Sequence, residues 1–263
     1  MIKELFGLGV KYEQNQSVAT IVIDNPPLNI LDEAIRVELM GLFEKVRDNG
    51  EVRVLILKGK GSKAFSVGSN LREFPLDRGV AGGRAKVVFE QKLHDLLESL
   101  PQVTIAVLRG YVLGGGCELM MPCDLRIASE GAVFGFPEVK VGGFPCSGGT
   151  QRLLRLIGVS KAKELLLLGN QITAKEAERL GLVNKVVPEE CLDQEVSLWV
   201  EQLLNLPWQS LKAIKRCVNE GALNPTRGQA LEVEEYEKVF ITRDMREGIN
   251  AFLEKRPPKY LHY

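Results

Sequence analysis

The chain has 263 residues, enough for one substantial core, or for a core with a small accessory region. Its 34 basic residues balance 34 acidic ones, and a net charge of zero argues against non-specific binding to nucleic acids or membrane surfaces. No stretch approaches the ~20 apolar residues that span a membrane, and the N-terminus lacks the pattern of a secretory signal. We therefore expect a cytoplasmic protein that binds neither nucleic acid nor membrane.

The first half of the chain alternates predicted strands with predicted helices. β-Branched or continuous apolar runs indicate strands, and apolar residues at helical spacing indicate helices. Strands separated by helices favour parallel pairing and an α/β architecture. The predicted strands are residues 17–24, 53–59, 104–110 and 124–129, and the predicted helices are residues 31–46 and 87–100. The glycine-rich stretch 74–86 predicts a mobile loop that could act as a lid.

The second half is mainly helical. A capping box, Thr173 to Glu176, opens one of its helices. From about Cys191 onward the pattern is helical only, interrupted by Pro207 and Pro225. We therefore divide the chain into a core, residues 1–190, and a helical oligomerisation region, residues 191–263. Further predicted helices are residues 151–157 and 161–168, and the apolar residues expected to be exposed in the tail are Trp199, Trp208, Val239 and Phe240.

The five cysteines stand at irregular spacing and form no C-x-x-C pair. This pattern predicts reduced thiols rather than a zinc site or a disulfide framework, so we expect no bound metal.

Two glycine-containing turns carry the candidate chemistry. Gly68 follows the predicted strand 53–59 within KAFSVGSNLREF, and Gly114 to Gly116 follow the predicted strand 104–110. Turns of this kind can aim two peptide N–H groups at one point, which is the arrangement of an oxyanion hole. Glu118 lies just beyond the second turn, and Glu138 follows Pro137 further along the same stretch. Carboxylates beside such a glycine run point to an enzyme that acts on a carbonyl compound.

Several motifs resemble those of the crotonase family, the enoyl-CoA hydratase/isomerase enzymes. They are GYVLGGGCELMMPCD, FGFPEVKVG, GGTQRLLRLIG, NPPLNIL, KAFSVGS and AFLEKR, and they cover nearly the whole chain in the family's order. The resemblance implies an α/β fold in which ββα turns repeat as a spiral, followed by a C-terminal helical trimerisation region. Homotrimers that pair into hexamers are also implied.

The resemblance also implies the roles of the site residues. The N–H groups of Ser69 and Gly115 would form an oxyanion hole for a thioester carbonyl. Glu118 matches the residue that acts as base toward water in hydratases, and Glu138 matches the one that exchanges a proton with Cα. An isomerase can work with the Glu138-type residue alone, so a chain with both glutamates is better suited to hydrating a 2-enoyl-CoA to a 3-hydroxyacyl-CoA.

The acyl-CoA site implied by the resemblance includes residues from three parts of the chain. No further cofactor is expected, because coenzyme A is part of the substrate. Lys255 could instead be an ordinary solvated lysine. The implied residues are Ala64, Ser66, Ser69, Asn70, Leu71, Arg72, Gly114, Gly115, Pro137, Phe252 and Lys255.

Two segments depart from the family's common pattern. Val67-Gly68-Ser69-Asn70 stands where many hydratases have Ala-Gly-Ala-Asp, and Pro145-Cys146-Ser147-Gly148-Gly149 replaces Pro-Gly-Ala-Gly-Gly. The first change keeps the N–H of residue 69. Both changes put the acyl specificity in question.

Other functions remain as alternatives. Within the family these are a double-bond isomerase, a thioester hydrolase or a decarboxylase, and from a different class a non-catalytic or RNA-binding relative. A Ser-His-Asp hydrolase would need a histidine, but His94 reads as a partly buried helix residue and His262 as a disordered one. A dinucleotide oxidoreductase is disfavoured because the glycine run is not G-x-G-x-x-G.

Overall fold

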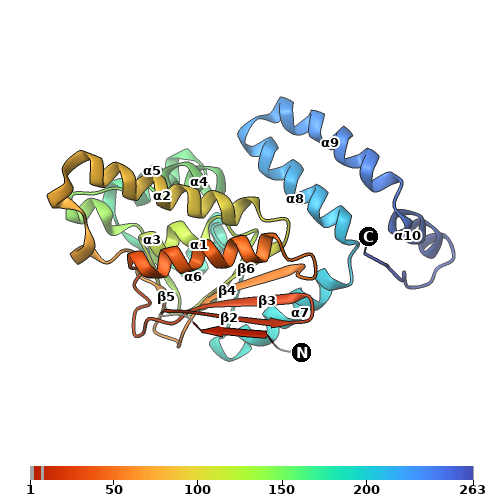
Figure 1. Ribbon diagram of the computed structural model, residues 1–263, viewed down its shortest axis with the longest axis horizontal. Coiled ribbons are helices and arrows are strands. Elements are labelled where there is room, and N and C mark those ends of the chain that lie inside the picture. Colours follow the sequence, from red (N-terminus) through yellow and green to blue (C-terminus); the bar gives the residue numbers. More distant parts are fainter. Residues whose placement is uncertain (1–2, 7–8, 263) are drawn as a thin grey trace.

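A seven-stranded sheet forms the centre of the computed structural model, which describes residues 3–6 and 9–262 (Figure 1). Its first three strands pair antiparallel, and the others pair parallel. In spatial order they are β1 (Lys3–Phe6), β2 (Val10–Asn15), β3 (Val18–Ile23), β4 (Val54–Gly59), β6 (Val103–Leu108), β8 (Leu125–Ser129) and β11 (Lys185–Val187). The four strands predicted from apolar runs are all confirmed.

A second, smaller sheet lies beside the first. It consists of β10 (Gln171–Thr173), β9 (Val133–Gly135), β7 (Tyr111–Leu113) and β5 (Ala64–Ser66). Chain order alternates between the two sheets, because β4, β6 and β8 are each followed by a short strand of the small sheet and then by a helix. This repetition is the predicted spiral of ββα turns.

Helices cover both faces of the large sheet, as its continuous apolar strands require. In Figure 1, α1 (Glu33–Arg47) and α2 (Gly79–Ser99) lie on one side and α7 (Leu192–Leu204) on the other. Phe43 of α1 and Leu97 of α2 belong to the main core, whereas Leu192 of α7 packs with Val54 and Ile105 in a second cluster. The remaining helices of the body are α3 (Gly115–Met120), α4 (Gly149–Ile157), α5 (Val159–Leu168) and α6 (Ala174–Leu180).

The prediction of a mobile loop over residues 74–86 is wrong. Two short 3₁₀ turns, η1 (Leu71–Glu73) and η2 (Leu76–Arg78), lead into α2, which already begins at Gly79. Glycines disfavour a helix by about 1 kcal/mol each, but contacts offset this cost. The Lys86 ammonium lies 2.6 Å from Glu90 one turn later and 4.7 Å from the centre of the Phe74 ring.

The helices after α7 project from the body (Figure 1). They are α8 (Trp208–Leu223), α9 (Pro225–Phe240) and α10 (Arg243–Leu253). Lys215 of α8 ties this part to the body through an ion pair of 2.8 Å with Asp124. Phe240 is exposed as predicted, whereas Trp199 is half-buried against the second cluster because α7 packs on the sheet. The predicted division at residue 190 lies between β11 and α7, and the projecting part begins at α8.

The C-terminal end is held by hydrogen bonds. The Asp244 carboxylate accepts the backbone N–H groups of Leu261 and His262, at 2.6 and 2.7 Å, so the expectation that His262 is disordered is wrong. None of the helices within the described residues is long and apolar enough to span a membrane.

Candidate active site

The two glycine turns meet at the ends of β5 and β7. Gly68 has a φ of +87°, and a Cβ built there would lie only 2.6 Å from the backbone nitrogen of Gly115. A Cβ built at Gly115 would lie 3.6 Å from the backbone nitrogen of Ser69. The peptide nitrogens of Ser69 and Gly115 are therefore close neighbours, and this approach requires glycine at position 68.

The NPPLNIL segment holds the first turn in place. Asn29 is fully buried, and its side-chain amide donates to the carbonyl oxygens of Ala64 and Lys60 at 2.7 and 3.0 Å. The backbone N–H of Leu31 donates to the carbonyl of Gly68 at 2.8 Å. Asn29 was not among the predicted site residues, although its motif, NPPLNIL, was one of those that indicated the family. Its role becomes visible only when residues about 35 positions apart are seen together.

Glu118 lies in the short helix α3, just after the second turn. Its Oε1 accepts the backbone N–H groups of Ser147 and Gly149, at 2.8 and 3.0 Å. The side chain is 5% exposed. Burial and the nearby charge of Glu138 raise the pKa of Glu118 to about 7, although the two N–H groups act in the opposite direction. The carboxyl group is thus fixed in place and able to change protonation state near neutral pH.

Glu138 reaches the same place from η3 (Pro137–Val141), the 3₁₀ turn after β9. A Cβ built at Gly114 would lie 3.1 Å from its Oε1, so this carboxylate sits against the second glycine turn. Its buried Oε2 finds no hydrogen-bond partner among the described residues. Burial raises the pKa of Glu138. The structure therefore brings both predicted glutamates to the predicted oxyanion hole.

The other predicted residues divide into two groups. Ala64 and Ser66 are fully buried in β5, and the Ser66 hydroxyl accepts the N–H of Gly68 at 3.0 Å. Asn70 begins η1 by accepting the N–H of Arg72, and Leu71 beside it is exposed. Gly114 and Pro137 flank Glu138.

Phe252 and Lys255 lie elsewhere. Figure 1 shows α10 at one end of the molecule and α3 and β5 toward the other, so one chain does not bring these two residues to the site.

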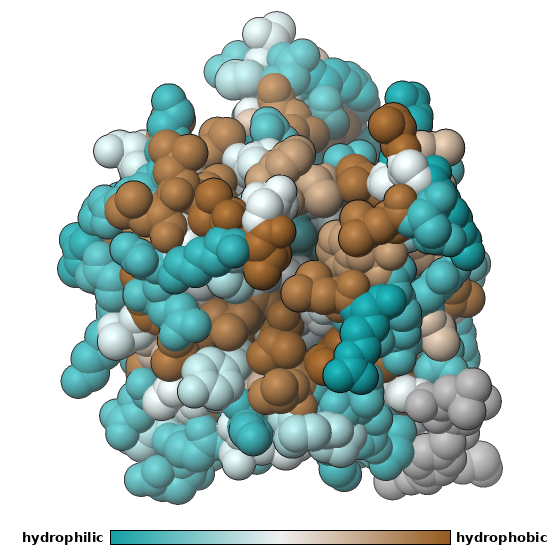
Figure 2. Space-filling model, turned by 90° about the vertical axis from the view of Figure 1, so that its left-hand side faces the viewer, coloured by the Kyte–Doolittle hydropathy of each residue, from teal (hydrophilic) through white to brown (hydrophobic). Residues whose placement is uncertain are grey.

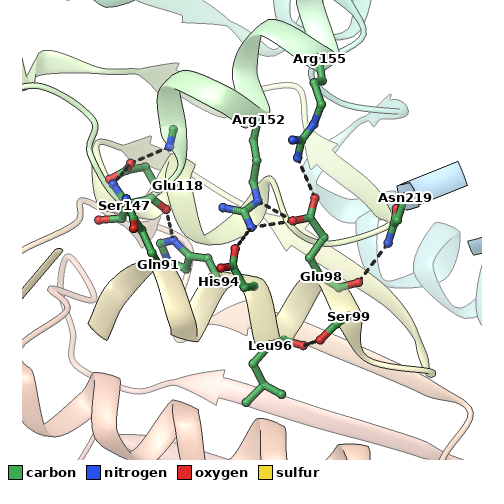
Figure 3. Close-up of polar contacts among 12 residues, drawn as sticks. Gln91, His94, Leu96, Glu98, Ser99, Glu118, Ser147, Arg152, Arg155 and Asn219 are labelled. Carbon is green, nitrogen blue, oxygen red and sulfur yellow. Dashed lines mark hydrogen bonds and ion pairs between the residues drawn. The ribbon is translucent and has the colours of Figure 1, made fainter. Parts of the chain in front are cut away.

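Three side chains of α2 hold the segment that binds Glu118, and two of them, Gln91 and His94, are labelled in Figure 3. The Gln91 amide donates to the carbonyl of Cys146 at 2.9 Å, and His94 Nδ1 donates to the carbonyl of Ser147 at 2.7 Å. The Ser147 hydroxyl donates to Glu90 at 2.6 Å. From the sequence, His94 is expected only as a partly buried helix residue, and Glu90 and Gln91 carry no site prediction. The one signal in the sequence is that Gln91 and His94 follow Glu90 by one and four positions, so that the three side chains can share one side of a helix.

Exposed apolar side chains stand close in the sequence to three of the site residues. Exposed Leu71, Val139 and Phe144 stand within three residues of Ser69, Glu138 and Ser147, respectively. Figure 2 views the end of the molecule at which α2 begins, and apolar side chains gather across its centre between charged ones. Such a surface suits a ligand with an apolar portion.

Known proteins resemble this chain over nearly its full length. The family model described as enoyl-CoA hydratase/isomerase matches residues 13–262. A crotonyl-CoA hydratase of Syntrophomonas wolfei is 38% identical over 251 residues, which cover 95% of this chain and 96% of that protein. A short-chain-enoyl-CoA hydratase of Clostridium acetobutylicum is 37% identical over 93% of this chain and 94% of its own length.

Solved structures agree with the sequence relatives. The enoyl-CoA hydratase of Bacillus anthracis superposes with a TM-score of 0.89 at 34% identity, covering 100% of this chain and 99% of that one. The family and the α/β fold predicted from the motifs are thus confirmed. With the same family indicated by motifs, by fold and by full-length similarity, the chain belongs to the enoyl-CoA hydratase/isomerase family.

Proposed function

We propose that this enzyme is an enoyl-CoA hydratase, which adds water across the 2,3 double bond of a 2-enoyl-CoA to give a 3-hydroxyacyl-CoA. The observation that carries the proposal is a pair of glutamates with raised pKa values, Glu118 buried and Glu138 half-buried, beside the closely spaced backbone nitrogens of Ser69 and Gly115. The matched relatives support the same reaction, since two of them are a crotonyl-CoA hydratase and a short-chain-enoyl-CoA hydratase.

In this mechanism the N–H groups of Ser69 and Gly115 donate to the thioester carbonyl oxygen, where negative charge develops as water attacks. One such donor is worth about 10²–10³ in rate. Glu118 takes a proton from the water whose oxygen bonds to C3, and Glu138 gives a proton to C2. The substrate thereby gains one molecule of water, and each proton transfer contributes about 10²–10⁴.

The protonation states required by this mechanism suit the site. The reaction needs one ionised and one protonated carboxyl group, and two carboxylates held close together do not readily ionise at once. A pKa of about 7 leaves a large ionised fraction of Glu118 at neutral pH. The two N–H groups that bind its Oε1 favour that ionised form.

Coenzyme A would bind along the first turn and beyond it. Ala64 and Ser66 are buried, so we expect them to contact the substrate through their backbone. Asn70 to Arg72 continue the chain from the first turn, and Gly114 and Pro137 lie beside Glu138. We expect no cofactor besides the substrate's own coenzyme A, because the backbone donors stabilise the enolate.

The projecting helices fit a homotrimer, alone or paired into a hexamer. Phe252 is 82% exposed and Ile241 is 83% exposed in the single chain, and burial of such side chains between copies would be favourable. Because α10 lies away from the site of its own chain, Phe252 and Lys255 would contact coenzyme A bound to a neighbouring copy. A cytoplasmic location and the absence of nucleic-acid partners complete the proposal.

The decisive test follows the loss of the conjugated thioester absorbance of crotonyl-CoA. We expect rapid hydration by the wild type and a loss of about 10²–10⁴ in kcat for Glu118→Gln. Glu164→Gln, an exposed glutamate paired with Lys161 on α5, serves as the control and should retain full activity. A wild type that converts a 3-enoyl-CoA but not crotonyl-CoA, with Glu118→Gln still active, would instead identify an isomerase.

A further inference from the structure

A buried ion pair lies between the two halves of the active site. Arg36 of α1 and Glu90 of α2 are 8% and 4% exposed, and Arg36 Nε lies 2.9 Å from Glu90 Oε1. Burial alone would raise the pKa of Glu90, but the charges of Arg36 and Lys86 outweigh this effect and lower it. Glu90 is therefore ionised, and it carries a second oxygen that can accept a further hydrogen bond.

Each end of this ion pair binds a serine hydroxyl. Arg36 Nη2 donates to Ser69 Oγ at 2.7 Å, and Ser147 Oγ donates to Glu90 Oε2 at 2.6 Å. The two serines stand in the two segments that depart from the common family pattern. In both cases the backbone N–H of the same serine belongs to the site. Ser69 supplies an oxyanion donor, and Ser147 supplies a donor to Glu118.

The remaining contacts fix Ser147 from the other side. Its carbonyl accepts from His94, and the carbonyl before it accepts from Gln91 (Figure 3). With the Glu90 contact, α2 therefore binds this segment at three points. A hydrogen-bonded path therefore runs from Ser69 through Arg36 and Glu90 to Ser147 and on to Glu118.

We propose that Arg36 and Glu90 are positioning residues that set the placement of the oxyanion donor Ser69 relative to the base Glu118. This inference rests on the proposed function and adds residues that touch no substrate. A buried ion pair contributes little net stability compared with apolar packing, so its expected contribution here is geometric. Hydration requires the carbonyl oxygen and the attacking water to be held at once, and small misplacements of such groups reduce rates strongly.

A double-mutant cycle tests the coupling between the two ends. Ser69→Ala and Ser147→Ala each remove a hydroxyl but keep the backbone N–H. We expect each variant to lower kcat about 10-fold with KM changed less than about 2-fold. The kcat of the double variant should be little lower than that of either single variant, because each change alone already breaks the path that joins Ser69 to Ser147. Losses that multiply to about 100-fold would overturn the proposal.

Two further variants separate positioning from general damage. Ser99→Ala, at the other end of α2, removes a hydroxyl that donates to the Leu96 carbonyl and should leave kcat unchanged. Arg36→Lys keeps the positive charge but loses the guanidinium group, whose separate nitrogens contact Glu90 and Ser69 at once. We therefore expect its kcat to fall about as much as that of Ser69→Ala. Full activity in Arg36→Lys would contradict the inference.

Binding of acetoacetyl-CoA gives a readout that needs no turnover. This thioester ionises to an enolate, whose absorbance reports stabilisation by the oxyanion hole. We expect Ser147→Ala, although it lies on the Glu118 side, to weaken enolate binding about 5-fold or more, and unchanged binding would contradict the proposal. A wild type that binds the enolate with this coupling but hydrates nothing would refute only the proposed function. One that neither binds nor reacts would refute both.

Discussion

Glu118 combines deep burial with two fixed hydrogen bonds, and these features affect its titration in opposite directions. The N–H groups of Ser147 and Gly149 favour the carboxylate, whereas the loss of water and the charge of Glu138 favour the acid. Burial outweighs the hydrogen bonds, and the pKa of Glu118 rises to about 7. A glutamate in water is already ionised well below neutral pH, whereas Glu118 loses its proton only near pH 7.

The pH dependence of hydration follows from this balance. Because Glu118 must be ionised to accept a proton from water, kcat/KM should rise about tenfold per pH unit below pH 7. At higher pH it should fall again where Glu138, which must be protonated to supply the proton to C2, loses that proton. The rates of wild type and Glu118→Gln are compared between pH 5 and pH 9, with a range of buffers as control. The rising limb should be absent from the residual activity of Glu118→Gln. If the kcat/KM of the wild type instead rises around the ordinary pKa of glutamate, burial does not determine the pKa of Glu118.

Gly68 allows a direct test of the close approach between the two turns. In Gly68→Ala the new Cβ would collide with the backbone nitrogen of Gly115, so we expect kcat to fall by about 10²–10³. Gly61→Ala is the matched control, because Gly61 has a similar φ of +77° but no atom within 4 Å of the built Cβ. That variant should lose about 1–2 kcal/mol of stability and keep its kcat. Equal kcat losses in both variants would rule out the collision as the cause.

The residues that could be predicted from the sequence are those within compact motifs. Glu118, Glu138 and the glycines stand in short stretches whose pattern indicates their chemistry. Arg36 and Glu90 do not, because each is a charged residue on a helix and looks like part of a solvated face. Their roles depend on partners that lie 33 and 57 positions away, Ser69 and Ser147.

Among the elements, an apolar run of sufficient length is what the sequence reveals, so the six-residue β2, whose sequence VKYEQN is largely polar, was not predicted. Strands β3, β4, β6 and β8 have five or six residues and a clear apolar pattern. Strands β5, β7, β9 and β10 have only three residues each, too few for any periodicity, although they carry the glycine turns. The beginning of α2 was missed for another reason: its glycines favour a loop, whereas the contacts of Lys86 with Glu90 and with the Phe74 ring favour the helix.

Helix α2 also gives the protein a pH-dependent stability. Burial, opposed by the hydrogen bond to the Ser147 carbonyl, lowers the pKa of His94 to about 4. The unfolded chain binds a proton near pH 6.5 and the folded chain only near pH 4, so stability is complete above pH 6.5 and falls as the pH drops toward 4. Over that range the titration of His94 lowers the free energy of unfolding by about 3 kcal/mol.

His94→Gln isolates this contribution. The glutamine amide can still donate to the Ser147 carbonyl but does not titrate, so the difference in unfolding free energy between wild type and variant should shrink as the pH falls from 6.5 to 4. Urea unfolding at several pH values measures it, and comparing the two proteins cancels the titration of Glu118. Parallel curves for the two proteins would mean that His94 is not the titrating group.

At the scale of the whole molecule, the residues predicted to bind coenzyme A lie in two separate parts of a single chain. The body carries the glycine turns and both glutamates, whereas Phe252 lies in α10 and Lys255 follows its end, and α10 stands at the other end of the molecule (Figure 1). No sequence pattern distinguishes a contact within one chain from a contact between copies. The motif AFLEKR therefore predicts Phe252 and Lys255 as coenzyme A contacts but does not indicate whether the coenzyme A is bound to the same chain or to a neighbouring copy.

Mixed oligomers can show which copy supplies Lys255. Glu118→Gln removes the base, and Lys255→Ala should raise the KM for the acyl-CoA while leaving the base intact. If each site takes Lys255 from a neighbour, random co-assembly of the two variants should give about a quarter of the sites both intact residues, and these should regain the wild-type KM. Homo-oligomers of each variant, kept apart and then pooled without exchange, are the control. If Lys255 serves its own chain, no mixed site contains both residues, and co-assembly restores nothing beyond the pooled sample.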